Sequence, residues 1–108
     1  MPTTKTLTIS SLHPSLPGHF PDNPIVPGVV ILEEVLEQIW QSVDEPLVLS
    51  KIPTVKFHSP LRPNESLQLT FNILPDHLVT FSCQVGSRRI ASGQFLFHAN
   101  NQASSPLS

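Results

Sequence analysis

Residues 19–37 read HFPDNPIVPGVVILEEVLE, and this stretch decides how the rest of the chain is arranged. Its first half is interrupted by three prolines: Pro21, Pro24 and Pro27. Each proline fixes φ and disfavours helical backbone in the residue before it. We therefore expect a stiff, extended loop up to residue 27 and a helix that begins near Gly28. His19 lies before this helix and Glu33 lies inside it, so the stretch carries two groups that can transfer protons.

The apolar residues after the loop predict a helix over Gly28–Val43. At about 100° per residue, its apolar side chains cover a wide arc: Val29, Ile31, Leu32, Val35, Leu36, Ile39, Trp40 and Val43. The polar remainder is narrow and holds Glu34, Glu37, Gln38 and Gln41. A helix with this pattern is expected to lie in the core. Glu33 falls at the seam beside Val29 and Trp40, and burial of that seam would favour the protonated carboxyl that a proton donor requires.

His19 and Glu33 each also have an ordinary structural explanation. A histidine in a loop is commonly exposed, and prolines before a helix are common punctuation. A glutamate in the first turns of a helix complements its dipole. The combination of the two residues with a helix N-terminus, whose first N–H groups have no intrahelical acceptor, favours an acid–base site.

The rest of the chain favours antiparallel β-structure. Five stretches are expected to be strands: residues 3–10, Leu47–Phe57 with a break near Pro53, Ser66–Leu74, Leu78–Val85 and Arg89–His98. Alternation of apolar and polar residues is clearest in Ser66–Leu74, which predicts one buried and one wet face. A strand, one helix and then several strands indicate an α+β fold. We expect a single domain over residues 1–98 and a flexible tail over residues 99–108.

Composition narrows the class of protein. The 108 residues are 39% hydrophobic and only 13% charged, which favours extensive burial, including burial against a second copy. The net charge of −2 without a basic run argues against nucleic acid as a partner. The single cysteine, Cys83, excludes an internal disulfide, and His58, His77 and His98 lack the spacing of metal ligands. No apolar leader or membrane-spanning run is present, so we expect a cytoplasmic protein.

The segment HFPDNPIVPGVVILEE resembles the active-site motif HFPxxPxxPGxxxxE of the hot-dog-fold 3-hydroxyacyl-ACP dehydratases of the FabA/FabZ type. A second block, VKFHSPLRPNESLQL, is similar to the family's pattern at Phe57, Pro60, Pro63 and Leu67. The resemblance covers about Leu7 to Phe97 and is closest to short, dehydratase-like members of secondary pathways. It implies an antiparallel sheet wrapped around one long central helix, in a homodimer or a larger dimer-based oligomer.

The resemblance also implies the chemistry. His19 and Glu33 fall on the catalytic residues, and Phe20, Pro21, Pro24 and Pro27 fall on the framework of the motif. The reaction is dehydration of a 3-hydroxyacyl thioester to a trans-2-enoyl thioester in fatty acid, polyene or polyketide-type biosynthesis. In the family, the two catalytic residues of a site come from different subunits. No cofactor is implied apart from the phosphopantetheine of an acyl carrier protein or CoA that carries the substrate.

Two backbone groups complete the expected site. The N–H groups of Gly28 and Val29 are expected to bind the thioester carbonyl, because a helix N-terminus presents unpaired donors and partial positive charge. The phosphopantetheine group and an acidic carrier protein require cations nearby. The candidates are Lys51, Lys56, Arg62, Arg88 and Arg89. Each of them is equally explained as a solvated charge at the end of a strand.

The chain departs from the family at several points. Asp22 and the pair Asn64-Glu65 replace a glycine and a Gly-Asp pair, and the sequence before the motif is shorter than in typical fatty-acid dehydratases. Two alternatives therefore stay open. One is an acyl thioesterase, because hot-dog proteins also hydrolyse thioesters. The other is a non-catalytic subunit that binds an acyl carrier or a larger dehydratase partner.

Overall fold

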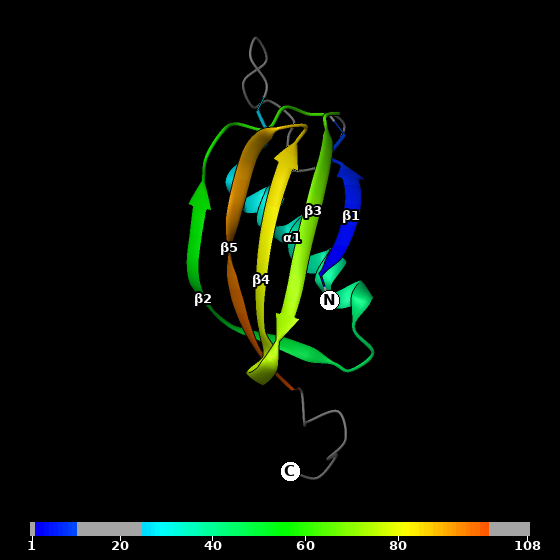
Figure 1. Cartoon of the computed structure of the whole chain (residues 1–108), viewed down its shortest axis with the longest axis vertical. Coiled ribbons are helices and arrows are strands. Elements are labelled where there is room, and N and C mark those ends of the chain that lie inside the picture. Colours follow the sequence, from blue (N-terminus) through cyan, green and yellow to red (C-terminus); the bar gives the residue numbers. More distant parts are fainter. Residues whose placement is uncertain (1, 11–24, 100–108) are drawn as a thin grey trace.

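The structure is a computed structural model that describes residues 2–10 and 25–99. The elements follow in the order β1 (Thr3–Thr8), α1 (Gly28–Ser42), β2 (Leu47–Phe57), β3 (Ser66–Leu74), the short 3₁₀ helix η1 (Pro75–His77), β4 (Leu78–Val85) and β5 (Arg88–Ala99). The strands form one five-stranded antiparallel sheet in the order β1-β3-β4-β5-β2. Helix α1 runs diagonally across one face of this sheet (Figure 1), which confirms the α+β class.

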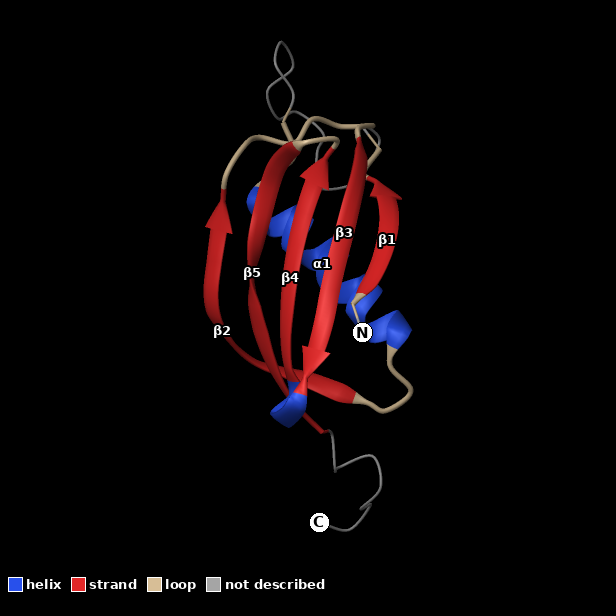
Figure 2. Ribbon diagram, viewed as in Figure 1, coloured by secondary structure: helices blue, strands red, loops and turns tan. Residues whose placement is uncertain are grey.

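The predicted elements lie close to the observed ones (Figure 2). The break expected near Pro53 appears as shifts in the register between β2 and β5, on either side of Lys51 and before Thr54. Proline has no N–H to donate to the neighbouring strand, so pairing is interrupted there. The flexible tail predicted over residues 99–108 lies outside the described residues except for Ala99, which ends β5, so the tail stays a prediction. In the described part of the chain, no helix has the length and apolar character needed to span a membrane.

The core lies between α1 and the sheet. The inward-facing residues of β3 and β4 alternate as expected and are buried: Leu67, Leu69 and Phe71 with Val79, Phe81 and Cys83. The rings of Phe81 and Phe95 stack with their centroids 4.8 Å apart. Burial raises the pKa of the Cys83 thiol to about 12, so at neutral pH this thiol is protonated and is not a nucleophile.

The side of α1 that is buried differs from the one predicted from the sequence. Val29 and Trp40 were expected in the buried arc, but their side chains are 63% and 39% exposed, and Glu33 is exposed as well. The sheet covers only one side of α1 and buries four residues there: Val30, Ile31, Val35 and Ile39. Periodicity gives the width of the apolar arc but does not say which part the sheet covers. The seam at Glu33 is therefore not buried within a single chain.

A β-bulge in β5 was also not expected. Cys83 pairs with Ala91 while Gln84 pairs with Arg89, so β5 has one extra residue, Ile90, which is fully buried. Its carbonyl oxygen accepts hydrogen bonds from the backbone N–H groups of His58 at 2.8 Å and Ser59 at 3.4 Å. The bulge therefore attaches the segment after β2 to β5, next to the start of α1.

Candidate active site

Among residues 2–10 and 25–99, no side chain caps the start of helix α1. Its N-cap residue is Pro27, whose side chain makes no capping hydrogen bond, and no acidic residue stands in the first turn. The carbonyl of Pro27 already accepts from Val30 at 3.0 Å and Ile31 at 3.3 Å. The N–H groups of Gly28 and Val29 have no intrahelical acceptor, and they carry the positive end of the helix dipole. This end of the helix can therefore bind an electron-rich oxygen of a ligand.

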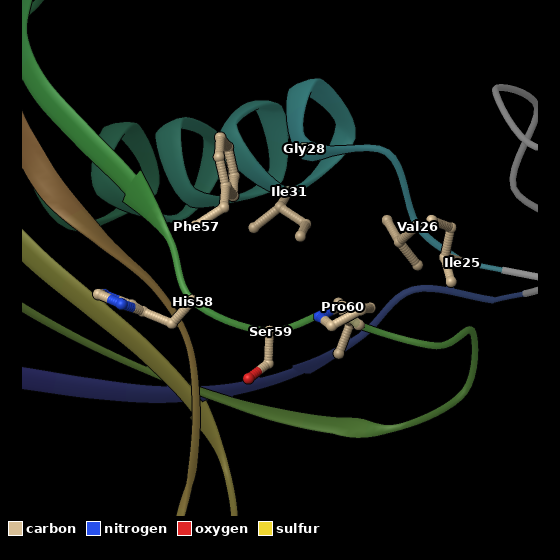
Figure 3. A pocket seen from close by; sticks show the side chains of 9 residues that line it. Ile25, Val26, Gly28, Ile31, Phe57, His58, Ser59 and Pro60 are labelled. Atoms are coloured by element: carbon tan, nitrogen blue, oxygen red, sulfur yellow. The ribbon is translucent and has the colours of Figure 1, made fainter.

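A pocket of about 390 Å³ lies at this helix start (Figure 3). One wall is formed by Ile25, Val26, Gly28 and Ile31, and the other by the segment from Phe57 to Leu61. The backbone N–H of Val26 donates to the carbonyl of Leu61 at 2.7 Å and joins the two walls. A largely apolar pocket with few polar groups, of this volume, is typical of a small-molecule site.

The ring of Phe57 packs directly on Gly28. A Cβ atom placed on Gly28 would lie 2.7 Å from Cζ of Phe57, so only glycine permits this approach. The ring is 52% exposed and lines the pocket beside the helix start. Sequence reasoning assigned the two residues to separate motif blocks and did not anticipate their contact.

Replacing Gly28 with alanine is expected to leave the fold intact and to lower activity. The new methyl group must displace the Phe57 ring, but the colliding atom is the far end of a half-exposed side chain, so the stability should change by less than about 1 kcal/mol. Turnover should fall about tenfold, because the pocket at the thioester site is reshaped. Denaturant unfolding and steady-state kinetics check both parts, and unchanged turnover would remove Gly28 and Phe57 from the site.

The side chain of Glu33 lies on a different side of α1 from the pocket at the helix start. It lines a second depression of about 390 Å³ together with Glu34, Leu36, Glu37 and Trp40. Gly28 and Glu33 are five residues apart, which places them about 140° apart around the helix axis. A single chain therefore does not bring the helix start and Glu33 into one pocket. His19, Phe20, Pro21 and Pro24 lie outside the described residues.

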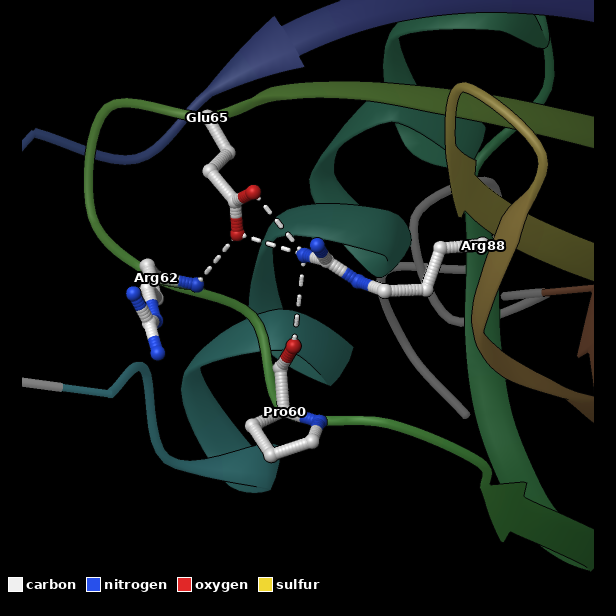
Figure 4. A network of polar contacts seen from close by, with 4 residues as sticks. All are labelled: Pro60, Arg62, Glu65 and Arg88. Atoms are coloured by element: carbon white, nitrogen blue, oxygen red, sulfur yellow. Dashed lines mark hydrogen bonds and ion pairs between the residues drawn. The ribbon is translucent and has the colours of Figure 1, made fainter.

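An ion-pair network fixes the loop that forms the outer wall of the first pocket (Figure 4). Nη2 of Arg88 donates to both carboxylate oxygens of Glu65, at 2.7 and 2.9 Å, and lies 3.5 Å from the carbonyl oxygen of Pro60. The backbone N–H of Arg62 donates to the same carboxylate at 2.7 Å. The network thus ties the start of β5 to the loop before β3.

The same loop explains one departure from the family pattern. Asn64 has φ of 70°, in the left-handed region where asparagine and glycine are the preferred residues. Asn64 can thus replace the glycine that the resemblance leads one to expect. Glu65 stands where the family pattern has the aspartate of the Gly-Asp pair, and it likewise carries a carboxylate. This carboxylate forms an ion pair with Arg88. Sequence reasoning named these residues but not their pairing, because they are 23 positions apart.

The network should make stability depend on pH. The hydrogen bond from Arg88, followed by that from the Arg62 backbone, lowers the pKa of Glu65 below its ordinary value of 4.5. The stabilisation is therefore fully present above pH 4.5 and is lost as the pH falls through the lowered pKa. Glu65→Gln should lower the melting temperature at neutral pH, and the gap to the wild type should narrow below pH 4.5. A gap that is constant down to pH 3 would contradict this origin.

Each described histidine has a side-chain partner or is exposed, and one of them, His58, also lines the pocket at the helix start. Nε2 of His58 lies 3.0 Å from the hydroxyl of Ser92, and Nε2 of His77 lies 3.0 Å from a carboxylate oxygen of Glu45. Among residues 2–10 and 25–99, no three histidine, cysteine or acidic side chains gather as ligands for a metal ion.

The architecture is that of the hot-dog fold, as the resemblance implied. The dehydratase heterocomplex ApeI:P from Xenorhabdus doucetiae has a similar structure, with a TM-score of 0.80 and 27% identity over 89% of this chain and 86% of that one. The fluoroacetyl-CoA thioesterase FlK shares only the fold, with a TM-score of 0.66 and 11% identity over 99% of this chain and 92% of its own.

Sequence comparison gives the family. Residues 3–94 match the ApeI-like family, described as ApeI dehydratase, and the chain belongs to this family. The 3-hydroxyacyl-[acyl-carrier-protein] dehydratase FabZ of Psychromonas ingrahamii is 35% identical over 77 residues, which are 63% of this chain and 51% of that protein. The chain spans between 50% and 62% of the length of such curated relatives.

Proposed function

We propose that this chain is a dehydratase that converts a 3-hydroxyacyl thioester into a trans-2-enoyl thioester. The observation that carries the proposal is the uncapped start of α1, which opens on an apolar pocket in a member of a dehydratase family. The C2 proton of a thioester is weakly acidic until its carbonyl is polarised. The N–H groups of Gly28 and Val29 are suited to this, because they direct positive partial charge at the position where the oxygen becomes negative.

The proton transfers are assigned to His19 and Glu33. Neutral His19 takes the proton from C2, Glu33 protonates the departing 3-hydroxyl, and water leaves as the bond between C2 and C3 becomes double. An imidazole titrates near neutral pH and can act as a base and then as an acid. Cys83 is buried and its pKa is raised to about 12, so it does not provide a competing nucleophile.

The active unit is proposed to contain two chains. Glu33 faces away from the helix start of its own chain, on an exposed surface that includes Val29 and Trp40. The neighbouring edge strand, β2, exposes Ile52 and Phe57, and such an edge favours pairing with another chain. A two-fold arrangement would place Glu33 of one chain at the helix start of the other and would form two identical sites.

The second chain is proposed to be another copy of this one. The similar structure from Xenorhabdus doucetiae is a heterocomplex, which gives a specific reason to test a different partner as well. Size measurement of the purified chain, alone and with a candidate dehydratase subunit, separates the two arrangements. A monomer in both samples would contradict the two-chain site.

The substrate is proposed to arrive on an acyl carrier protein, with CoA as the alternative carrier, in fatty acid, polyene or polyketide-type biosynthesis. The test is mass spectrometry of the products formed from a panel of 3-hydroxyacyl thioesters. Loss of one water with the thioester bond intact supports dehydration. Release of free thiol assigns the chain to thioester hydrolysis, and absence of any product assigns it to a non-catalytic role.

A further inference from the structure

Another pocket adjoins the one at the start of α1 and lies along the loop between β2 and β3. Its volume is about 430 Å³, and its lining shares Ile25, Ser59 and Pro60 with the pocket at the helix start. Its other walls are formed by Arg62, Glu65 and Arg88. The two pockets therefore adjoin one another. Together we call them the trough, which is apolar at the start of α1 and charged at the end lined by Arg62, Glu65 and Arg88.

The two arginines of the charged end are in different situations. Arg88 is engaged by the Glu65 carboxylate and by the carbonyl oxygen of Pro60. Arg62 is exposed, and it joins the network by a hydrogen bond from its backbone N–H (Figure 4). The charge of its guanidinium has only the smallest of the effects that act on the pKa of Glu65. In the described part of the chain, the Arg62 guanidinium makes no hydrogen bond or ion pair. Since Arg88 and Glu65 balance each other, Arg62 leaves this end of the trough with one positive charge to offer.

The other cations named from the sequence do not line the trough. Lys51 and Lys56 belong to β2, and Arg89 belongs to β5. None of them contributes to either of the two joined pockets. Of the five candidates, only Arg62 lines the trough with a guanidinium that forms no hydrogen bond or ion pair within the described residues.

We propose that Arg62 binds the phosphate group of the phosphopantetheine arm that carries the thioester. This inference rests on the proposed function, because it places the thioester at the start of α1 and its arm along the trough. A guanidinium donates two parallel hydrogen bonds to a phosphate, which makes arginine the residue best suited to such a group. Acyl carrier protein and CoA both present this phosphate, so the subsite recognises the chemistry that the two carriers share.

The experiment compares one 3-hydroxyacyl group on three carriers: acyl carrier protein, CoA and N-acetylcysteamine, which lacks phosphate. Arg62→Ala is expected to raise KM about tenfold for a phosphate-bearing carrier, as expected for the loss of one charge-assisted contact, with kcat unchanged. KM for the N-acetylcysteamine thioester should stay as in the wild type. Arg62→Lys should recover part of the loss, and added salt should reduce the difference between variants.

Arg89→Ala is the matched control, because it removes the same charge from an exposed arginine outside the trough. A rise of KM with CoA only, or with acyl carrier protein only, supports the subsite and identifies its carrier. An equal rise with N-acetylcysteamine, or an effect no larger than that of Arg89→Ala, overturns it.

The dehydratase activity and the phosphate subsite can be tested separately, so failure of one is distinguishable from failure of the other. Turnover of the N-acetylcysteamine thioester by the wild type tests the chemistry alone. If no thioester is turned over, calorimetry with 4′-phosphopantetheine and pantetheine tests the subsite alone. The wild type should bind the phosphorylated compound about tenfold more tightly, and Arg62→Ala should abolish this preference. Equal affinities in the wild type would overturn the proposal.

Discussion

Replacing Glu33 with glutamine is expected to slow enoyl thioester formation by about 10²–10⁴-fold, the usual contribution of a positioned acid or base. Glutamine has nearly the same shape but cannot donate a proton to the departing hydroxyl. Glu33 is exposed on α1, so the substitution should not disturb the core. The measurement is kcat with a 3-hydroxyacyl thioester, accompanied by the unfolding curve of the variant.

Glu37→Gln provides the matched control. Glu37 is exposed one turn further along the same helix and lines the same depression as Glu33. Its carboxylate accepts a hydrogen bond from the Gln41 side chain at 3.2 Å, and a glutamine oxygen can accept in its place. Turnover should stay within about twofold of the wild type, since surface substitutions of this kind usually have small effects. Equal losses in both variants would show that charge on this surface matters, rather than the acid at Glu33.

Gly93→Ala is expected to lower the stability of the fold more than Gly28→Ala or Glu65→Gln does. A Cβ atom at Gly93 would lie 2.5 Å from the carbonyl oxygen of Thr54 and 3.0 Å from Cα of Val55. Both colliding atoms belong to the backbone of β2, which pairs with β5 at this point. The edge strand must move away, and overpacking of this kind costs about 1–3 kcal/mol.

Denaturant unfolding of the two alanine variants side by side tests this reasoning. Gly28→Ala meets the movable end of a side chain, whereas Gly93→Ala meets fixed backbone. The midpoint should therefore fall clearly for Gly93→Ala and change little for Gly28→Ala. Wild-type stability of Gly93→Ala would mean that β2 does not lie this close to β5.

Local signals in the sequence predicted the elements well. The prolines before Gly28 fixed where α1 begins, and strict alternation predicted β3 and β4 at their observed bounds. These features depend on neighbouring residues, whose effects on φ and on the direction of side chains are short-ranged. The α+β class follows from the order of such elements and was predicted for the same reason.

Features that depend on distant residues were not predicted. The ring of Phe57 on Gly28 and the pairing of Arg88 with Glu65 join separate parts of the chain. The bulge at Ile90 depends on how β5 pairs with β4. Helical periodicity could not show that the sheet leaves the side of α1 with Glu33 uncovered. The expected seam is buried only if a second chain covers it, and no property of a single sequence determines this.

We propose that His19 of one chain and Glu33 of another act together in one dehydration site. Mixing two inactive variants, His19→Ala and Glu33→Gln, under conditions that exchange subunits tests it most directly. A mixed dimer would contain one site in which both residues are intact, because the substitutions fall together in the other site. Activity is expected to return to about a quarter of the wild-type level after random exchange. A mixture as inactive as its two components, or normal turnover by either variant alone, would contradict it.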